Sequence, residues 1–167
     1  MLAITKDHIF DEEVDLRKSI LKLPIKRRLL IRDSARDIEL EPQDIGVGIS
    51  QVLPVVVAAL HCRTGLVAIE QPELHIHPAF QVALGDLFIE QVRECPDLNF
   101  ILETHSEHLM LRLLRRIRET GEHNVPKTKR LTPSDLSINF IEQTKTGISC
   151  KTIRVDQDGD FVDHWPR

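Results

Sequence analysis

Two short, mainly apolar runs stand out along the chain, and each stops at an acidic residue. Residues 66–70 read LVAIE and residues 99–103 read NFILE. Continuous apolar runs of this length, the first bounded by Gly65 and Pro72, are typical of strands buried on both faces of a parallel sheet. The pattern therefore predicts two such strands, separated by a helix.

Polar residues follow both predicted strands at the point where each strand ends. Glu70 closes the first strand, and Glu103 closes the second, just before Thr104, His105 and Ser106. The carboxyl ends of parallel strands meet at one edge of an open α/β sheet, where such sheets bind their ligands. We therefore expect a functional site at this edge.

Helical patterns occupy the segments around the strands. Residues 52–60 are continuously apolar, residues 79–92 have apolar positions at helical spacing, and residues 107–119 follow a serine that can cap them. Alternating residues 136–143 and 148–155 flank a turn with glycine, which predicts a hairpin. The predicted fold is α/β, with a mainly parallel sheet flanked by helices and a C-terminal β-hairpin.

The helix predicted at 107–119 carries four arginines near its C-terminal end. Arg112, Arg115, Arg116 and Arg118 complement the helix dipole at that end, and we expect them to face outward. Contact with DNA or a partner surface is the alternative interpretation.

The first 40 residues carry little pattern. Residues 10–23 predict an amphipathic helix, and a basic cluster follows at 26–28. Such clusters usually form a solvated face, with nucleic-acid contact as the alternative. We divide the chain into a helical or linker segment, residues 1–40, which can be the end of a missing lobe, and a lobe at residues 41–167.

Composition narrows the functional classes. A net charge of −4 argues against a surface devoted to nucleic acid, and an aromatic content of 4% without Tyr argues against a base-stacking platform. Three widely spaced cysteines fit a reducing cytoplasm. No apolar run reaches the roughly 18 residues of a membrane span. We therefore expect a cytoplasmic protein without membrane contact.

A glycine-rich turn precedes the apolar segment at 52–60. Gly46, Gly48 and Ser50 are typical of a helix N-terminus that binds phosphate, because glycine lets the backbone approach and the free N–H groups favour an anion. Alternatively, Ser50 is the N-cap of a buried helix. No GxxxxGKS/T phosphate loop occurs in the 167 residues.

Histidines and acids near the strand ends raise a metal-site hypothesis. The side chains concerned are His75, His77, His105, His108, Glu70, Glu73 and Glu103. Three or four of them could bind a transition metal, which makes a metal-dependent hydrolase one interpretation. Against it, the spacing does not obviously bring the imidazoles to one ion, and no HExxH motif occurs.

A nucleotide site accounts for more of the same residues. An acid that closes a buried strand, such as Glu70, can hold Mg²⁺ while the metal bridges phosphate oxygens. Gln71 would face the attacking water, and His105 could reach the γ-phosphate of ATP. A glycine-led helix N-terminus could supply backbone donors.

Three stretches, in this order, resemble the C-terminal half of an ABC-type ATPase head, of the RecF-like, SMC-like and overcoming-lysogenisation-defect kinds. DIGVGISQVLP is similar to the signature segment, LVAIEQPELHIHP to the Walker B strand with its D-loop, and FILETHSEHL to the switch-histidine strand. With the closing DGDFVDHWP, they look closest to bacterial predicted ATPases of AAA type that end in a Trp-Pro tail. The resemblance covers about residues 40–167.

The resemblance implies a role for individual residues. Glu70 takes the Walker B position and would hold Mg²⁺, and Gln71 falls where most ABC ATPases carry the catalytic glutamate. His105 takes the switch position. The D-loop falls on residues 74–77, including His77, and would cross a dimer interface.

Gly46 and Gly48 fall on the signature, which in this class contacts the γ-phosphate of ATP bound to the partner head. Ser50 is a second candidate there. The resemblance implies ATP and Mg²⁺ as ligands and a homodimer of heads as the working form. Nucleic-acid binding, DNA transactions and phage defence are possible outputs only at the level of the family.

Two departures from the family pattern matter. Gln71 can orient a water but cannot take its proton, so we expect slow hydrolysis or help from Glu73 or a phosphate oxygen. The Walker A lobe is missing, so we expect a partner lobe, in a longer chain or another chain, and no turnover by these residues alone. The alternatives are a metal-dependent hydrolase using His75, His77 and His105, and a non-catalytic fragment that oligomerises.

Overall fold

The computed structural model describes residues 29–165, and the chain divides into two units after Glu41. The described part of the first unit contains a small antiparallel hairpin, in which β1 (Ile31–Asp33) pairs with β2 (Ile38–Leu40). The helix expected at 10–23 and the basic cluster at 26–28 lie outside the described residues.

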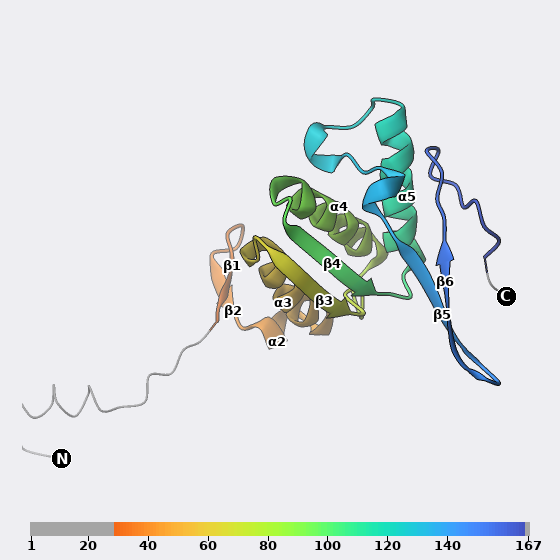
Figure 1. The fold of residues 1–167 in the computed structure, drawn as a ribbon. Coiled ribbons are helices and arrows are strands. Elements are labelled where there is room, and N and C mark those ends of the chain that lie inside the picture. The colour runs from red at the N-terminus through yellow and green to blue at the C-terminus, as the bar shows by residue number, and fades with distance from the viewer. Residues whose placement is uncertain (1–28, 166–167) are drawn as a thin grey trace, which may run out of the picture. The chain divides into compact units, whose positions relative to one another are not determined.

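The second unit alternates helices with strands and ends in a hairpin (Figure 1). Its elements are α2 (Pro42–Ile45), α3 (Val47–His61), β3 (Gly65–Glu70), α4 (Pro78–Glu94), β4 (Leu98–Glu103), α5 (Glu107–Gly121), the 3-10 turns η2 (Lys127–Lys129) and η3 (Pro133–Asp135), β5 (Ile138–Thr144) and β6 (Gly147–Ile153). Within residues 29–165, no helix has the length and apolar content needed to cross a membrane.

β3 and β4 lie side by side and run parallel, with Glu70 opposite Glu103 at the shared end. Both strands occupy the predicted segments, and the predicted C-terminal hairpin is present as β5 and β6. The expectation of a mainly parallel sheet is met only by the β3–β4 pair. The other two sheets among the described residues are antiparallel hairpins.

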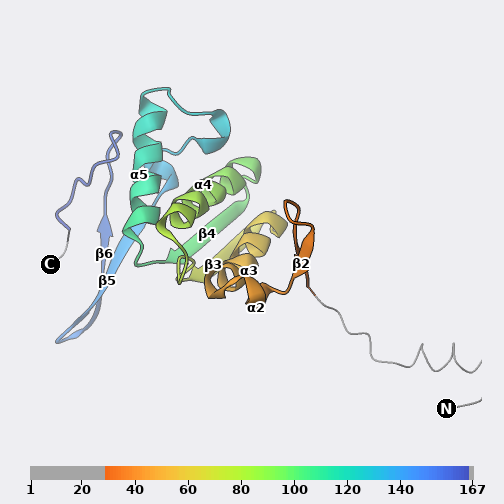
Figure 2. The same ribbon diagram turned by 180° about the vertical axis from the view of Figure 1, so that it is seen from behind.

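Within residues 29–165, only one face of the β3–β4 pair is covered. Helices α3 and α4 pack on the same face and lie in front of the strands in Figure 2. On the opposite face Leu66 is 63% exposed and Ile101 is 57% exposed. The expectation that both faces are buried is therefore wrong for the described part of the chain, because alternate residues of each strand face away from the helices.

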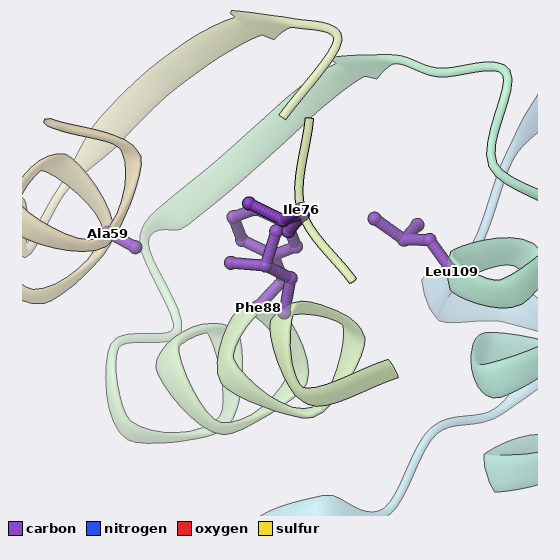
Figure 3. Packing of buried hydrophobic residues seen from close by; sticks show 5 residues of the cluster. Ala59, Ile76, Phe88 and Leu109 are labelled. Carbon is purple, nitrogen blue, oxygen red and sulfur yellow. The ribbon is translucent and has the colours of Figure 1, made fainter. Parts of the chain in front are cut away.

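The core of the second unit also holds the loop that follows β3. Ile76 of this loop lies against Phe88 of α4, while Ala59 and Leu109 approach from α3 and α5 (Figure 3). Ile76 is only 8% exposed. Burying a side chain of this size contributes about 1.5–3 kcal/mol, so Ile76 anchors the loop to the core.

A cluster of ion pairs joins α4 to α5. Arg112 and Arg116 of α5 each donate two hydrogen bonds to the carboxylate of Asp86 on α4, at 2.7–2.9 Å. Burial disfavours the charged form of Asp86, but hydrogen bonds from Arg116 and Arg112 outweigh this effect. The pKa of the Asp86 carboxyl therefore lies well below its ordinary value.

The prediction that the α5 arginines face outward is wrong for Arg116, which is only 9% exposed. Arg115 pairs with Glu119, and Arg118 pairs with Asp160. Because all four guanidinium groups already have carboxylate partners, the helix presents no unpaired arginine to a nucleic acid.

The last described residues fold back on the hairpin. The ring of Trp165 lies 5.8 Å from that of Phe140 on β5 and 5.2 Å from that of Phe161. Gly159 has φ +74°, and a Cβ there would lie 2.3 Å from the carbonyl oxygen of Leu114 on α5. Both contacts give this segment a structural role.

Candidate functional site

The strand ends bring an acid and a histidine to the same edge of the sheet. Glu70 and Glu103 are register partners, and the N–H of Gln71 donates to the carbonyl of Glu103 at 2.8 Å. His105 follows two residues later. The Glu70 carboxylate is exposed and makes no hydrogen bond or ion pair with another described residue. It is therefore available to a ligand.

A pocket of about 470 Å³ opens beside this edge. It is lined by Gln71, Glu73, Leu74, His75, Gln81, His105, Ser106, Glu107 and His108. The three residues predicted to be catalytic, Gln71, Glu73 and His105, thus share one pocket. The lining residues come from the two segments that follow β3 and β4 and from the first turns of α4 and α5.

Glu73 is the buried acid of this pocket. It is 9% exposed, and its Oε1 accepts a hydrogen bond from the backbone N–H of His105 at 2.7 Å. Its Oε2 is buried and has no partner among residues 29–165. An unpartnered buried carboxylate oxygen is costly, and it usually marks a place where a ligand or water binds.

Gln81 connects the segments after the two strands, and no sequence pattern marks it as a functional residue. Its Nε2 donates to the carbonyl of Ile76 at 3.0 Å, and its Oε1 accepts from the hydroxyl of Ser106 at 2.6 Å. Ser106 caps α5, as predicted, by accepting from the N–H of Leu109 at 2.9 Å. Of these contacts, only the helix cap at Ser106 could be recognised from the local sequence.

His75 and His77 have different hydrogen-bond partners. Nδ1 of His75 lies 2.8 Å from Oε1 of Gln51 on α3, whereas Nδ1 of His77 accepts from the N–H of Ala79 and caps α4. Among the described residues, no group of three His, Cys, Asp or Glu side chains is arranged to hold a metal ion. The alternative of a hydrolase with a metal on His75, His77 and His105 therefore has no support here.

The glycine-rich turn forms the start of α3. Gly46 is the N-cap with φ +115°, and the space around its Cα is open. The alternative that Ser50 is the N-cap is wrong: Ser50 lies inside α3 and donates to the carbonyl of Val47 at 2.8 Å. The helix begins earlier than predicted, so Pro54 lies in its interior.

Gly48 is held close to the loop after β3. A Cβ at Gly48 would lie 2.3 Å from the carbonyl oxygen of His75. Gly46, Gly48 and His77 all line a second pocket, of about 180 Å³, whereas Ser50 does not. The start of α3 and the loop after β3 therefore form one surface.

Comparison with known protein families identifies a match over two of the second unit's strands, β3 and β4, and part of its helices. Residues 3–110, more than half of the chain, match the family model described as the AAA ATPase domain. No curated protein and no solved structure matches the chain. The matched range contains the glycine-rich turn, both strands of the parallel pair and every residue that lines the larger pocket. The chain therefore belongs to the AAA ATPase domain family.

Proposed function

We propose that this chain is the signature and Walker B part of an ABC-type ATPase head. The observation that carries the proposal is the shared pocket, which brings Gln71, Glu73 and His105 together; Glu70 directly precedes Gln71 in the chain but is not among the lining residues. Similarity to RecF-like, SMC-like and overcoming-lysogenisation-defect heads, and to relatives with a Trp-Pro tail, is part of this proposal. A complete head would bind ATP and hydrolyse it.

Glu70 would be the magnesium ligand. Its carboxylate is exposed, closes a strand and has no competing partner among the described residues. Carboxylate oxygen is the ligand that Mg²⁺ prefers, usually alongside water and phosphate oxygens. Bound there, the ion would neutralise charge on the phosphate oxygens of ATP.

Gln71 and Glu73 would together supply the two functions of a single catalytic glutamate, which are to orient the attacking water and to accept its proton. The amide of Gln71 orients the attacking water but cannot take its proton. Glu73 lines the same pocket, and its buried Oε2 is an acceptor without a partner among the described residues. Glu73 would therefore accept the proton that Gln71 cannot.

His105 would contact the γ-phosphate from the neighbouring strand end. Its imidazole is exposed, lines the pocket and makes no hydrogen bond to another described residue. Only the backbone of His105 is held, through Glu73. The imidazole is thus free to donate to a phosphate oxygen.

The phosphate loop would come from another lobe, in the same longer protein or in a second chain. No GxxxxGKS/T occurs in the 167 residues, so the lysine and backbone nest for the β-phosphate have to be supplied from outside them. The open N-cap Gly46 would face ATP on a partner head, with His77 at the interface between heads.

Nucleotide binding and turnover test this proposal directly. A fluorescent ATP analogue with Mg²⁺ should bind the 167-residue chain weakly, and Glu70→Gln should abolish that binding, whereas Glu122→Gln, an exposed glutamate at the end of α5, should not. The chain alone should not turn over ATP. A rate comparable with that of a complete ATPase, lost in Glu70→Gln, would show that no further lobe is needed.

A non-catalytic fragment that oligomerises is the second candidate. Leu66 and Ile101 leave an apolar sheet face uncovered among the described residues, and such faces mark interaction surfaces. Size-exclusion chromatography separates the two. Oligomers that form equally with and without Mg²⁺-ATP favour the second candidate.

A further inference from the structure

Two independent connections join the segments that follow β3 and β4. One is the hydrogen bond from the His105 N–H to Oε1 of Glu73. The other runs from the carbonyl of Ile76 through the amide of Gln81 to the hydroxyl of Ser106. Residues 71–77 and 104–106 are therefore held together at two points, the His105 N–H and the Ser106 hydroxyl.

The chemistry of Gln81 leaves only one arrangement of these bonds. A backbone carbonyl can only accept, so the group facing Ile76 has to be the NH₂ of Gln81. The amide oxygen then faces Ser106, whose hydroxyl donates its one proton to Gln81 and accepts from the N–H of Leu109. The NH₂ and the oxygen of the Gln81 amide therefore each have a hydrogen-bond partner, and the Ser106 hydroxyl both donates and accepts.

This connection joins the loop anchored by Ile76 to the segment that carries the exposed His105 imidazole. The side chain of Ile76 is buried in the core, while the imidazole of His105, next to Ser106, is exposed. Gln81 itself lies in the first turn of α4, a helix whose N-terminus is capped by His77. Gln81 is therefore joined to the segment that carries His105 through the Ser106 hydroxyl, and it makes no hydrogen bond to the imidazole.

We propose that Gln81 is a positioning residue, which together with Glu73 holds His105 against residues 71–77. The loss of the Gln81 amide frees residues 104–106, so that the imidazole of His105 samples several positions instead of one. The catalytic consequence rests on the proposed role of His105, but the positioning itself does not. In a complete head, a Gln81 variant should lower kcat for ATP and leave KM nearly unchanged.

Amide hydrogen exchange of the 167-residue chain, followed by NMR, tests the positioning. Gln81→Met keeps the length of the side chain but removes both hydrogen bonds, and should accelerate exchange of the His105 N–H about tenfold. Exchange of the Leu114 N–H, inside α5, should not change. Gln91→Met is the matched control, because it makes the same substitution at a buried position of α4 away from the pocket.

An unchanged His105 exchange rate in Gln81→Met contradicts the proposal, and so does an equal acceleration at Leu114, which would indicate general destabilisation. If Gln81→Met does not fold, Gln81→Glu keeps an acceptor for Ser106, removes the donor to Ile76 and adds a negative charge. The same selective acceleration is expected, and its absence contradicts the proposal.

The His105 imidazole signals separate this inference from the proposed function. If Mg²⁺-ATP leaves them unshifted in the wild type while Gln81→Met still accelerates exchange, the positioning stands and the proposed function fails. If Mg²⁺-ATP shifts them but Gln81→Met has no effect, the proposed function stands and the positioning fails.

Discussion

The backbone N–H of His105 donates to Oε1 of Glu73 at 2.7 Å, which ties the segment after β4 to the loop after β3. The second oxygen of Glu73 faces no donor among the described residues. One carboxylate thus has a structural oxygen and a free one. The two can be separated by mutation.

Replacing Glu73 should distinguish these two oxygens. Glu73→Ala leaves the His105 N–H without its partner and should lower the free energy of unfolding in urea by about 1–3 kcal/mol. Glu73→Gln keeps an acceptor and should recover most of that loss, but it cannot take a proton and should not restore hydrolysis in a complete head. Glu107→Ala, an exposed acid of the same pocket, should change stability by about 0.5 kcal/mol or less. If a complete head with Glu73→Gln hydrolyses ATP at the wild-type rate, Glu73 is not the general base.

Replacing Asp86 should cost far more than replacing a surface acid. Asp86→Asn leaves Arg112 without a charged partner and Arg116 with Glu119 alone, in a mostly buried site, so unfolding should become easier by about 3 kcal/mol. Asp160→Asn breaks only the exposed pair with Arg118 and should cost less than about 1 kcal/mol. Similar losses in the two variants, measured by urea unfolding, would argue against the buried cluster.

The same cluster predicts a loss of stability in acid. The folded-state pKa of Asp86 lies below its unfolded value of about 3.9, so its contribution is complete above that pH and declines as the pH falls toward the folded pKa. Urea unfolding of the wild type should therefore become easier below about pH 4. Asp86→Asn should show a smaller dependence on pH over this range. An identical acid profile in the two proteins would contradict the assignment.

Adding a methyl group to Gly48 should disturb the contact between α3 and residues 71–77. The new Cβ would lie 2.3 Å from the carbonyl oxygen of His75, so Gly48→Ala should cost about 1–3 kcal/mol and shift the NMR signals of residues 74–77. Gly121→Ala is the control, because its Cβ would make an ordinary contact. A Gly48→Ala variant as stable as the wild type would show that the contact has room to adjust.

Features with a local signal could be predicted from the sequence. The strand ends at Glu70 and Glu103, the cap at Ser106 and the hairpin follow from apolar runs, a capping residue and a turn. The pairing of Gln81 with Ser106, or of Gln51 with His75, joins residues 24 or 25 positions apart, and no local pattern marks it. Such partners are known only once the chain is folded.

Two errors have a common physical cause. The run at residues 66–69 predicts burial on both faces, yet burial depends on what packs on each face and not on the run itself. Likewise, the charge of Arg116 predicts exposure, but Asp86 compensates for its burial. Periodicity and charge describe one element at a time, whereas both outcomes depend on a second element.

The most direct test of the central claim is paramagnetic broadening by Mn²⁺-ATP, because it detects weak binding. NMR signals of Glu70, Gln71 and His105 should broaden first in the 167-residue chain, and Glu70→Gln should remove this effect while Glu122→Gln preserves it. Broadening centred elsewhere, or equal broadening in wild type and Glu70→Gln, would contradict a magnesium-nucleotide site at the shared end of β3 and β4.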